Sequence, residues 1–417
     1  MAREMKDSGI DWLSLIPCDW VIKRNKSLFY EVNERCVDGS KLTLLSVSEY
    51  TGVTPRVSII KDGEFETHAE SLDGYKICKS GDIVMNIMLA WKRATATSRF
   101  DGIVSPAYSV YRGRGSVDTR YYHYLFRTDI CADMFKRYST GIIDSRLRLY
   151  PDVFLSLSSP VPSLEEQSRI ADFLDTECGR IDAVIEQTRA SIEEYKKLKQ
   201  SVITQAVTKG IRPNRPMKDS GVEWIGEIAE NFEIKKLKYL CYILDQYRSP
   251  VTADQRNQEA EILYDYYGAS GAIDKIDGYT IDDHVMLIGE DGANLRLRNL
   301  PLMYEVNGKA WINNHAHILK PRENVDFDYL FFALESLDIN TYITGSAQPK
   351  LSQENLKQIW VPVPDYEEQR EIAQYLKGKS AEIDGIIDRK QHFLTELENL
   401  KRTIIYEYIT GKKEVPE

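Results

Sequence analysis

The sequence MKDSGIDW at residues 5–12 decides the fold of this chain, because it returns as MKDSGVEW at residues 217–224. The first five residues of the two stretches are identical, and the last three keep their chemical character. A second pair, VPSLEEQ at 161–167 and VPDYEEQ at 363–369, follows in the same order. The copies lie 212 residues apart at the first motif and 202 at the second, so the segments between the motifs differ in length. Such repetition predicts two copies of one structural unit.

The repeat divides the 417 residues into two domains, two long helices and a linker. A chain of this length is expected to form two or more domains, and hydrophobic residues make up 42% of it, enough for a core in each. The linker contains Pro213 and Pro216, which cannot continue a helix. The predicted boundaries are 1–160 for the first domain, 161–210 for the first helix, 211–216 for the linker, 217–362 for the second domain, 363–412 for the second helix and 413–417 for a tail.

Each copy ends in a predicted helix of roughly 45 residues, about 70 Å long. A capping-box pattern opens each helix and a glycine ends it. The capping pairs are Ser163 with Glu166 and Asp365 with Glu368, and the glycines are Gly210 and Gly411. Apolar residues recur at alternating spacings of three and four, which indicates a coiled-coil stripe. The stripe includes Ile181, Ile185, Ile192 and Leu198 in the first helix and Ile383, Ile387, Leu394 and Leu400 in the second.

A narrow apolar stripe on so long a helix requires a partner helix, and the sequence leaves two partners open. The helix could pair with its counterpart in a second copy of the chain, or with the other long helix of the same chain. We favour antiparallel pairing within the chain. The linker and the second domain must then bring the chain around to the far end of the first helix, which would place the two domains at opposite ends of the helix pair.

The segments 20–160 and 232–362 mix short β-rich stretches with turns, which predicts an α+β fold for each. Overall we expect two α+β domains separated by two long helices, related by an internal pseudo-two-fold repeat. The predicted strands are 42–48, 81–86, 107–111, 285–288 and 315–319, and the predicted short helices are 121–135 and 327–337.

The net charge of −10 at first argues against a nucleic-acid-binding protein. The charge is uneven, however: residues 1–160 carry +2 and residues 217–361 carry −9. Attraction of DNA depends on the field within about 10 Å of a groove more than on the total charge. The acidic second copy therefore suggests that a partner protein supplies part of the positive surface.

The six cysteines form no CxxC pair, which indicates reduced thiols in the cytoplasm and no disulfide framework. The first residues are polar and charged, unlike a signal peptide. The longest apolar run, around 83–91, is too short to span a bilayer. We therefore expect a cytoplasmic protein with no membrane association.

No catalytic motif for nucleotide binding, metalloprotease or serine hydrolase chemistry occurs in the sequence, and we expect no catalytic residue and no metal. His315 and His317 could form half of a metal site, but their alternation is more typical of a strand with both histidines on one face. The loop 289–294 could hold a phosphate, but turn chemistry explains its glycines as well, and its two acidic residues would oppose an anion.

Polar residues in turn-rich stretches are the remaining candidates for a binding function. Arginine suits guanine edges, asparagine and glutamine suit adenine, and lysine suits phosphate. Each residue alone is more often a solvated surface group, and the set is the signal. The predicted DNA-binding residues are Lys92, Arg93, Arg99, Tyr108, Arg146, Arg148, Asn294, Arg296, Asn313, Asn314, Gln348 and Lys350.

This arrangement resembles the specificity (S) subunit of type I restriction-modification enzymes over essentially the whole chain. The resemblance rests on the two pairs of repeated motifs, on GDIV at 81–84, GIVSPAY at 102–108 and GKAWINNH at 308–315, and on GSAQPKLS at 345–352. The first copy departs from the last motif, because GIIDSRLR at 141–148 lacks the glutamine and lysine. The resemblance in this motif therefore does not extend to Arg146 and Arg148.

The resemblance implies a non-catalytic subunit in which each target-recognition domain reads one half of a bipartite site in double-stranded DNA. It implies that the helix pair sets the spacing between the halves and docks two methyltransferase subunits, which carry S-adenosylmethionine. Restriction subunits that use ATP and Mg would join the complex, and this chain would hold no cofactor. Two alternatives are a coiled-coil scaffold that binds only protein, and a fused nuclease or methyltransferase, which the missing motifs disfavour.

Overall fold

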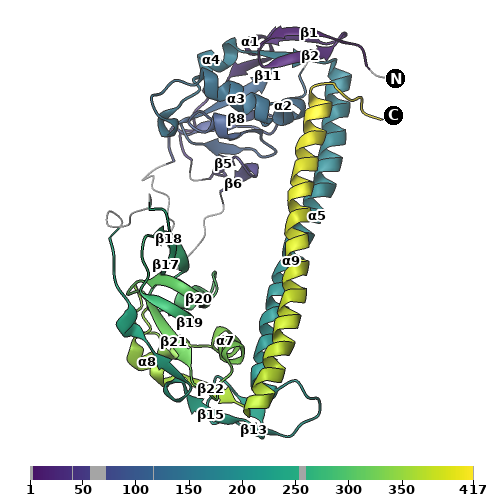
Figure 1. Cartoon of the computed structure of the whole chain (residues 1–417). Helices are drawn as coiled ribbons and strands as arrows, with labels where there is room; N and C mark the ends of the chain where they lie inside the picture. The colour runs from purple at the N-terminus through teal and green to yellow at the C-terminus, as the bar shows by residue number, and fades with distance from the viewer. Residues whose placement is uncertain (1–2, 40, 57–71, 116, 253–259, 417) are drawn as a thin grey trace. The chain divides into compact units, whose positions relative to one another are not determined.

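Two long helices dominate the computed structural model of the chain (Figure 1). Helix α5 spans Leu164–Lys209 and helix α9 spans Tyr366–Ile409. The structure describes residues 3–39, 41–56, 72–115, 117–252 and 260–416. Within these ranges no helix combines the length and the apolar character needed to cross a membrane.

The ends of the long helices confirm the predicted caps. Ser163 Oγ accepts a hydrogen bond from the backbone N–H of Glu166 at 3.2 Å, and Asp365 Oδ1 accepts one from Glu368 at 2.9 Å. These bonds satisfy N–H groups that have no partner within the helix. At the other ends Gly210 and Gly411 adopt φ values of 73° and 71°, the left-handed conformation in which helices often end.

The two long helices pair antiparallel, as predicted. Lys401 Nζ of α9 lies 2.6 Å from Asp182 of α5, and Lys199 Nζ of α5 lies 2.6 Å from Asp384 of α9. An early part of each helix therefore contacts a late part of the other. Figure 1 shows the two helices side by side.

The apolar stripe lies along this pairing with different degrees of burial. Ile181, Ile185, Ile192, Ile383 and Ile387 are buried, and Leu394 is half-buried. Leu198 and Leu400, which occupy equivalent positions in the two copies, remain 48% and 49% exposed. A straight α-helix of 3.6 residues per turn drifts away from a 3.5-residue repeat, so the last residues of such a stripe turn toward the edge. A docking role for these residues remains a prediction.

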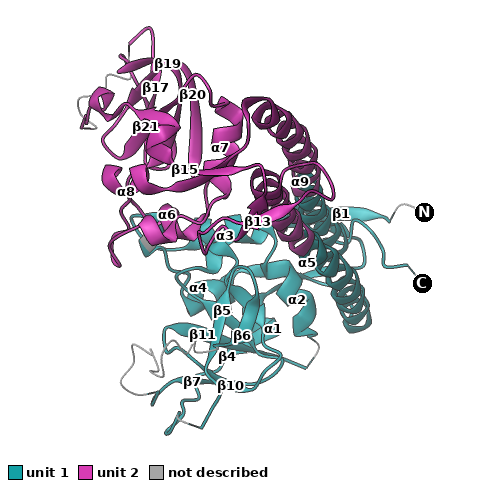
Figure 2. Ribbon diagram, turned by 90° about the horizontal axis from the view of Figure 1, so that it is seen from below, with its two compact units in different colours: residues 1–188, 392–417 teal, residues 189–391 magenta. Residues whose placement is uncertain are grey.

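The structure divides into two units, each of which takes parts of both long helices (Figure 2). Unit 1 comprises Met1–Thr188 and His392–Glu417, and unit 2 comprises Arg189–Gln391. The core of unit 1 includes Leu174 of α5 and Ile409 of α9. The core of unit 2 includes Val207 of α5 and Leu376 of α9. Each globular segment is therefore packed onto the start of one long helix and the end of the other.

Unit 1 is built on a four-stranded sheet of order β4-β11-β8-β9. These strands are β4 Phe29–Glu31, β11 Tyr108–Gly113, β8 Ile83–Asn86 and β9 Thr95–Thr97. The two-stranded pairs are β1 Met5–Ile10 with β2 Leu13–Pro17, β3 Val21–Arg24 with β12 Ser158–Val161, β5 Leu45–Ser48 with β6 Gly52–Pro55, and β7 Lys76–Cys78 with β10 Gly102–Val104. The short helices are α1 Asn25–Leu28, η1 Ala90–Lys92, α2 Thr119–Phe126, α3 Asp129–Tyr138, η2 Asp144–Arg146 and α4 Pro151–Ser156.

Unit 2 is built on a six-stranded sheet of order β16-β21-β19-β20-β17-β18. These strands are β16 Cys241–Ile243, β21 Ala316–Pro321, β19 Ile281–Gly289, β20 Met303–Ile312, β17 Tyr264–Gly268 and β18 Gly271–Ile276. The two-stranded pairs are β13 Met217–Asp219 with β14 Glu227–Ala229 and β15 Glu233–Lys236 with β22 Trp360–Val363. The short helices are η3 Leu237–Tyr239, η4 Asp245–Tyr247, α6 Asn294–Leu297, α7 Phe327–Ser336, η6 Asn340–Tyr342 and α8 Gln353–Gln358.

The two units share a core topology, which confirms the predicted repeat. The order β4-β11-β8 in unit 1 corresponds to β16-β21-β19 in unit 2, and all of these pairs are antiparallel. A helix (α2 or α7) follows the middle strand, and a shorter helix (α4 or α8) and a strand (β12 or β22) precede the long helix. Unit 2 replaces the small pairs β5-β6 and β7-β10 with the extra strands β17, β18 and β20.

The repeated opening motif forms the same turn in both units. Asp7 Oδ1 accepts from the N–H of Gly9 at 2.8 Å, and Asp219 Oδ1 accepts from Gly221 at 2.9 Å. Both glycines have a positive φ, 72° and 71°, which a residue with a side chain rarely adopts. The turn therefore explains why Asp-Ser-Gly recurs.

The predicted short elements are confirmed except for one helix. Each predicted strand overlaps an observed one, namely β5, β8, β11, β19 or β21, and the predicted helix 327–337 is α7. The predicted helix 121–135 is wrong, because it is two helices, α2 and α3. Thr128 interrupts it, since its Oγ1 accepts from the N–H of Cys131 and caps a new helix.

Candidate nucleic-acid interface

The last glutamine of each repeated Pro-x-x-Glu-Glu-Gln motif fixes the globular segment to its long helix. Gln167 is fully buried, and its Oε1 accepts from the backbone N–H of Asp118, the N-cap of α2, at 2.9 Å. Gln369 accepts in the same way from Asp326, the N-cap of α7, also at 2.9 Å. Each amide group also donates to the backbone of its own motif at 3.0 Å. The motif therefore orients the helix that follows the central sheet.

The second glutamate of the motif holds the opening segment of each unit. Glu166 accepts hydrogen bonds from Arg3 Nη1 at 2.5 Å and from Trp20 Nε1 at 2.9 Å. Glu368 forms the equivalent pair with Arg215. Although burial opposes the charge of Glu368, the hydrogen bonds from Arg215 lower its pKa. A capping box alone did not predict these long-range partners.

Two loops meet at the end of the central sheet in unit 1. The loop after β8 carries Lys92 and Arg93, and the loop before α4 carries Arg146 and Arg148. The N–H of Leu149 donates to the carbonyl of Ile87 at 2.9 Å, which joins the two loops. The structure thus brings these four predicted residues to one end of the sheet.

Their side chains differ in how free they are to contact a ligand. Lys92, Arg146 and Arg148 are exposed. Arg93 forms an ion pair with Asp129 and has φ of 65°. Tyr108 begins β11 opposite Asn86 and lies beside the same loops. The DNA-binding role of all five residues remains a prediction.

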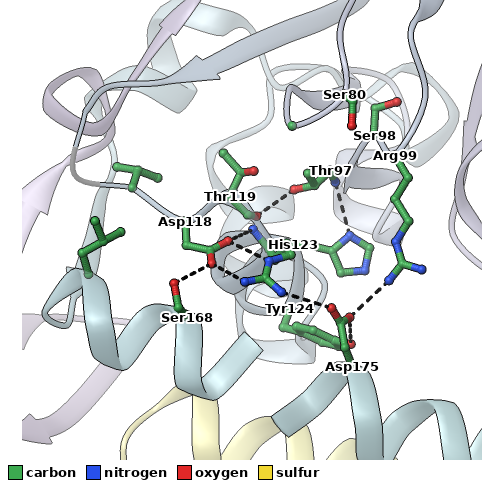
Figure 3. Close-up of a pocket in the computed structure, with 14 residues that line it drawn as sticks. Ser80, Thr97, Ser98, Arg99, Asp118, Thr119, His123, Tyr124, Ser168 and Asp175 are labelled. Carbon is green, nitrogen blue, oxygen red and sulfur yellow. Dashed lines mark hydrogen bonds and ion pairs between the residues drawn. The ribbon is translucent and has the colours of Figure 1, made fainter. Parts of the chain in front are cut away.

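Arg99 lies elsewhere in unit 1, beside a cavity of about 460 Å³ lined by residues from α2 and α5. Its guanidinium pairs with Asp175 of α5 at 3.2 Å, and the Tyr124 hydroxyl donates to the same carboxylate at 2.8 Å. Figure 3 shows Arg99 and Tyr124 converging on Asp175. The structure therefore does not place Arg99 with the loops that carry the other candidates.

The same end of the sheet in unit 2 collects the remaining candidates. The N–H of Leu351 donates to the carbonyl of Glu290 at 2.7 Å, equivalent to the bond between Leu149 and Ile87 in unit 1. Glu290 also forms an ion pair with Lys350 Nζ at 3.0 Å. The loops 290–298, 313–315 and 344–350 thereby meet.

The unit 2 candidates separate into exposed residues and residues that hold the loops. Asn314, Gln348 and Lys350 are exposed. Asn313 is buried, and its Oδ1 accepts from the N–H of His315 at 2.7 Å. Asn294 exchanges hydrogen bonds with the backbone of Leu300 and Pro301, and Arg296 donates to the carbonyl of Ile343 at 3.3 Å. Direct contact with bases remains a prediction for all of them.

A buried polar network lies behind these loops. His317 is 1% exposed and bridges Asp245 at 2.7 Å and the carbonyl of Leu351 at 2.8 Å. Burial opposes the charge of Asp245, but the hydrogen bond from His317 lowers its pKa. Arg248 pairs with both Asp245 and Glu290. Sequence reasoning missed this network, since no local pattern links these positions.

The expectation that His315 and His317 share one face of a strand is wrong. His315 lies in the turn before β21 and pairs with Asp291 at 2.7 Å. Both ring nitrogens of His317 are already engaged by protein groups. The two side chains therefore serve different contacts.

Two further arginines, Arg298 and Arg127, shape the loops. Arg298 ends α6 with φ of 51°, as Arg93 ends η1 in unit 1, and it donates to the carbonyls of Glu335 and Leu337. Arg127 donates to carbonyls of the β5-β6 turn and to that of Arg93 at 3.0 Å. Burial lowers the pKa of Arg127 to about 10. Arg298 and Arg93 share one sequence signal: each is an arginine at the end of a short helix that follows a central strand.

Comparison with known proteins finds the same description in a family model and in curated relatives. The family described as "Type I restriction modification DNA specificity domain" matches residues 229–392. The MjaVIII type I restriction enzyme specificity subunit of Methanocaldococcus jannaschii is 24% identical over 95% of this chain and 93% of its own length. A putative type I restriction enzyme specificity subunit of Haemophilus influenzae is 30% identical, but that alignment covers 40% of this chain and 39% of the relative.

A solved structure has the same fold. A chain from a structural study of complex assembly and conformational transition of the type I R-M system superimposes with a TM-score of 0.71 at 17% sequence identity. The superposition covers 95% of this chain and 99% of the other. At this level of sequence identity, the superposition shows that the two chains share a fold.

Proposed function

We propose that this chain is a type I restriction enzyme specificity subunit, the non-catalytic subunit that selects the DNA sequence for its complex; the family-model match and the full-length similarity to such a subunit support the proposal. Each globular segment, within the proposed domains 1–160 and 217–362, would read one half of a bipartite site in double-stranded DNA. The catalytic steps would belong to partner subunits.

One observation carries this proposal: the two units share a scaffold and differ at the loops. The bond from Leu149 to Ile87 in unit 1 and the bond from Leu351 to Glu290 in unit 2 join equivalent loops at the same end of equivalent sheets. A protein that reads two different half-sites needs this combination of a constant frame and variable contacts.

The exposed residues at these loops differ in chemistry between the units. Unit 1 presents Lys92, Arg146 and Arg148, whereas unit 2 presents Asn314, Gln348 and Lys350. Arginine pairs with guanine, and asparagine and glutamine pair with adenine, while lysine contacts phosphate. We therefore expect the first half-site to be richer in guanine contacts and the second in adenine contacts.

The paired helices would set the spacing between the two half-sites and dock the partners. Both α5 and α9 are continuous over more than forty residues and contribute to both units. A stiff connection of this kind fixes a distance in a way that a flexible linker does not. Two methyltransferase subunits carrying S-adenosylmethionine would bind the helices, restriction subunits using ATP and Mg would join them, and the complex would act in the cytoplasm.

A gel-shift titration with the partner methyltransferase subunit present tests the proposal. The complex should prefer DNA that contains its bipartite site over the same DNA with scrambled half-sites by at least about 10³-fold, the lower end for specific binding. An equal affinity for both would instead favour a scaffold that binds only protein. Binding of S-adenosylmethionine or cleavage of DNA by the purified chain alone would contradict the non-catalytic role.

A further inference from the structure

The two globular segments are attached to the long helices by the same buried anchors. The hydroxyl of Tyr121 in α2 donates to the carbonyl of Ile409 at the end of α9, at 2.9 Å. The hydroxyl of Tyr329 in α7 donates equivalently to Val207 at the end of α5, at 3.3 Å. The buried Gln167 and Gln369 add identical bonds to the two N-caps. These anchors fit either segment and do not distinguish one from the other.

The charged contacts around these anchors differ between the units. In unit 1 the cations of this contact lie on the globular segment and the anions on the helix, although Arg120 also pairs with Asp118 of its own segment at 2.7 Å. Arg120 of α2 contacts Asp172 at 2.5 Å and Asp175 at 3.7 Å, both on α5. Arg99 adds a second cation at Asp175. We name Arg99, Arg120, Asp172 and Asp175 the first charged contact, and Figure 3 shows its Asp175 facing Arg99.

In unit 2 the signs at the equivalent contact are reversed, with the anion on the globular segment and the cation on the helix. Asp328 of α7 contacts Lys377 Nζ of α9 at 2.6 Å. This hydrogen bond, together with the nearby charges of Glu305 and Asp326, raises the pKa of Lys377. We name Asp328 and Lys377 the second charged contact.

The two contacts occupy equivalent positions with opposite signs. Arg120 and Asp328 are each the second residue after the N-cap of their helix, and that N-cap is Asp118 in α2 and Asp326 in α7. Asp175 and Lys377 each lie eight residues after the anchoring glutamine. The pair is therefore basic-on-acidic in unit 1 and acidic-on-basic in unit 2.

The neighbouring positions support the same reversal. Tyr124, whose hydroxyl donates to Asp175, corresponds to Phe332 in α7, which has no hydroxyl group to donate. The phenol would have no acceptor beside a lysine, whereas it has one beside Asp175. The reversal thus extends beyond a single ion pair.

We propose that each globular segment is matched by charge to its own long helix, so that the order of the two segments along the chain is fixed by the first and second charged contacts. This proposal goes beyond the proposed function and does not depend on DNA reading. If the segments changed places, Arg120 would face Lys377, and Asp328 would face Asp175. The buried anchors would still form, and like charges would oppose them.

A crossed exchange of segments and helix charges tests the proposal. In the first chain the order of segments is natural, and in the second residues 21–161 and 233–363 are exchanged. Each full-length chain is made with the natural helix charges and with Asp175→Lys plus Lys377→Asp. Hydrogen–deuterium exchange then measures the protection of residues 119–126 and 327–336, or of their exchanged counterparts, because protection reports local opening.

We expect the effect of the helix substitutions to change sign with the order of the segments. In the natural order they should lower protection about three- to tenfold, and in the exchanged order they should raise it, as expected for partly exposed ion pairs. The difference should shrink at about 1 M salt, where the screening length falls to about 3 Å. The same sign in both orders, or no dependence on salt, would overturn the proposal.

Point variants of the natural chain decide the matter even if the exchanged chain does not fold. Arg120→Asp and Asp175→Lys alone should each lower the protection of α2, and the double variant should recover much of it. The matched control combines Arg120→Asp with Lys377→Asp, which lie in different units, and should show no recovery. Charge matching would be refuted if α2 in the double variant of Arg120→Asp and Asp175→Lys were no better protected than the product of the two single effects predicts.

Discussion

Replacing Gln167 with leucine should selectively weaken unit 1, because this buried side chain joins α2 to α5. The amide accepts from the N–H of Asp118 at 2.9 Å and donates to the carbonyl of Pro162 at 3.0 Å. Leucine has a similar volume, so the packing changes little while both hydrogen bonds disappear.

The magnitude follows from the two groups that lose their partners. A buried donor or acceptor without a partner costs about 1–3 kcal/mol. Together, the unpaired N–H of Asp118 and the unpaired carbonyl of Pro162 should therefore cost about 2–6 kcal/mol, toward the lower value where water reaches the helix end. This is a large share of the stability of a single domain, which is about 5–15 kcal/mol.

Urea unfolding combined with hydrogen exchange measures this loss and locates it. We expect a lower unfolding midpoint and faster exchange in residues 119–126 and 164–175, with α7 protected as in the natural chain. Gln369→Leu should produce the same loss in unit 2, since Gln369 makes the equivalent bonds to Asp326 and Pro364. Both variants are tested in the full-length chain.

Gln205→Leu is the matched control, because Gln205 is an exposed residue of α5. It undergoes the same chemical change without losing a buried bond, and surface changes of this kind usually stay within about 0.5 kcal/mol. A Gln167→Leu variant as stable as Gln205→Leu would refute the role assigned to the motif.

Three further predictions follow from the site, the cavity and the helices. Lys350→Ala should weaken the binding of DNA by the assembled complex and reduce the slope of log affinity against log salt by about 1. Lys196→Ala, on the exposed face of α5, is the control. An unchanged slope would exclude a contact between Lys350 and phosphate. Burial, followed by the nearby Arg127 and Arg99 charges, lowers the pKa of His123 from 6.5 to about 3. Below about pH 6.5 the unfolded chain therefore binds a proton that the folded chain does not. The free energy of unfolding should then fall as the pH falls, by up to about 1.4 kcal/mol per pH unit. Urea unfolding between pH 6.5 and 5 should show a shallower loss for His123→Gln, and parallel curves would contradict this. Lys199 and Asp384 pair across the two long helices, and four residues can be inserted beside each of them, after Gln200 and after Asp384. The double insertion should lengthen the gap in the recognised DNA sequence, since four helical residues add about 6 Å. Methylation at the original gap would exclude the spacing role.

The sequence predicted the frame of this molecule because its signals are local and occur twice. The spacing of Ser163 to Glu166 and of Asp365 to Glu368 predicts two helix starts, and both caps form as expected. The stripe through Ile181 and Ile383 predicted a paired helix for the same reason. Such features depend on a few neighbouring residues, so one chain suffices to recognise them.

The contacts that hold the loops of the candidate site could not be predicted, because they join residues far apart in the chain. Asn294 and Asn313 have the chemistry of base-reading residues, yet their amides hold the loops themselves. Arg99 sits in a turn like the other candidates but pairs with Asp175, which is 76 residues away. Nothing in the local sequence separates an arginine facing a helix from one facing DNA, because both occupy exposed turns.

Replacing residues 217–361 with the corresponding segment of a type I restriction enzyme specificity subunit tests the central claim most directly. The hybrid chain is expressed with its methyltransferase subunit, and the methylated adenines in the host genome are mapped. One half of the recognised sequence should change while the other half and the gap stay the same. A recognised sequence that does not change, or one that changes in both halves, would contradict the account.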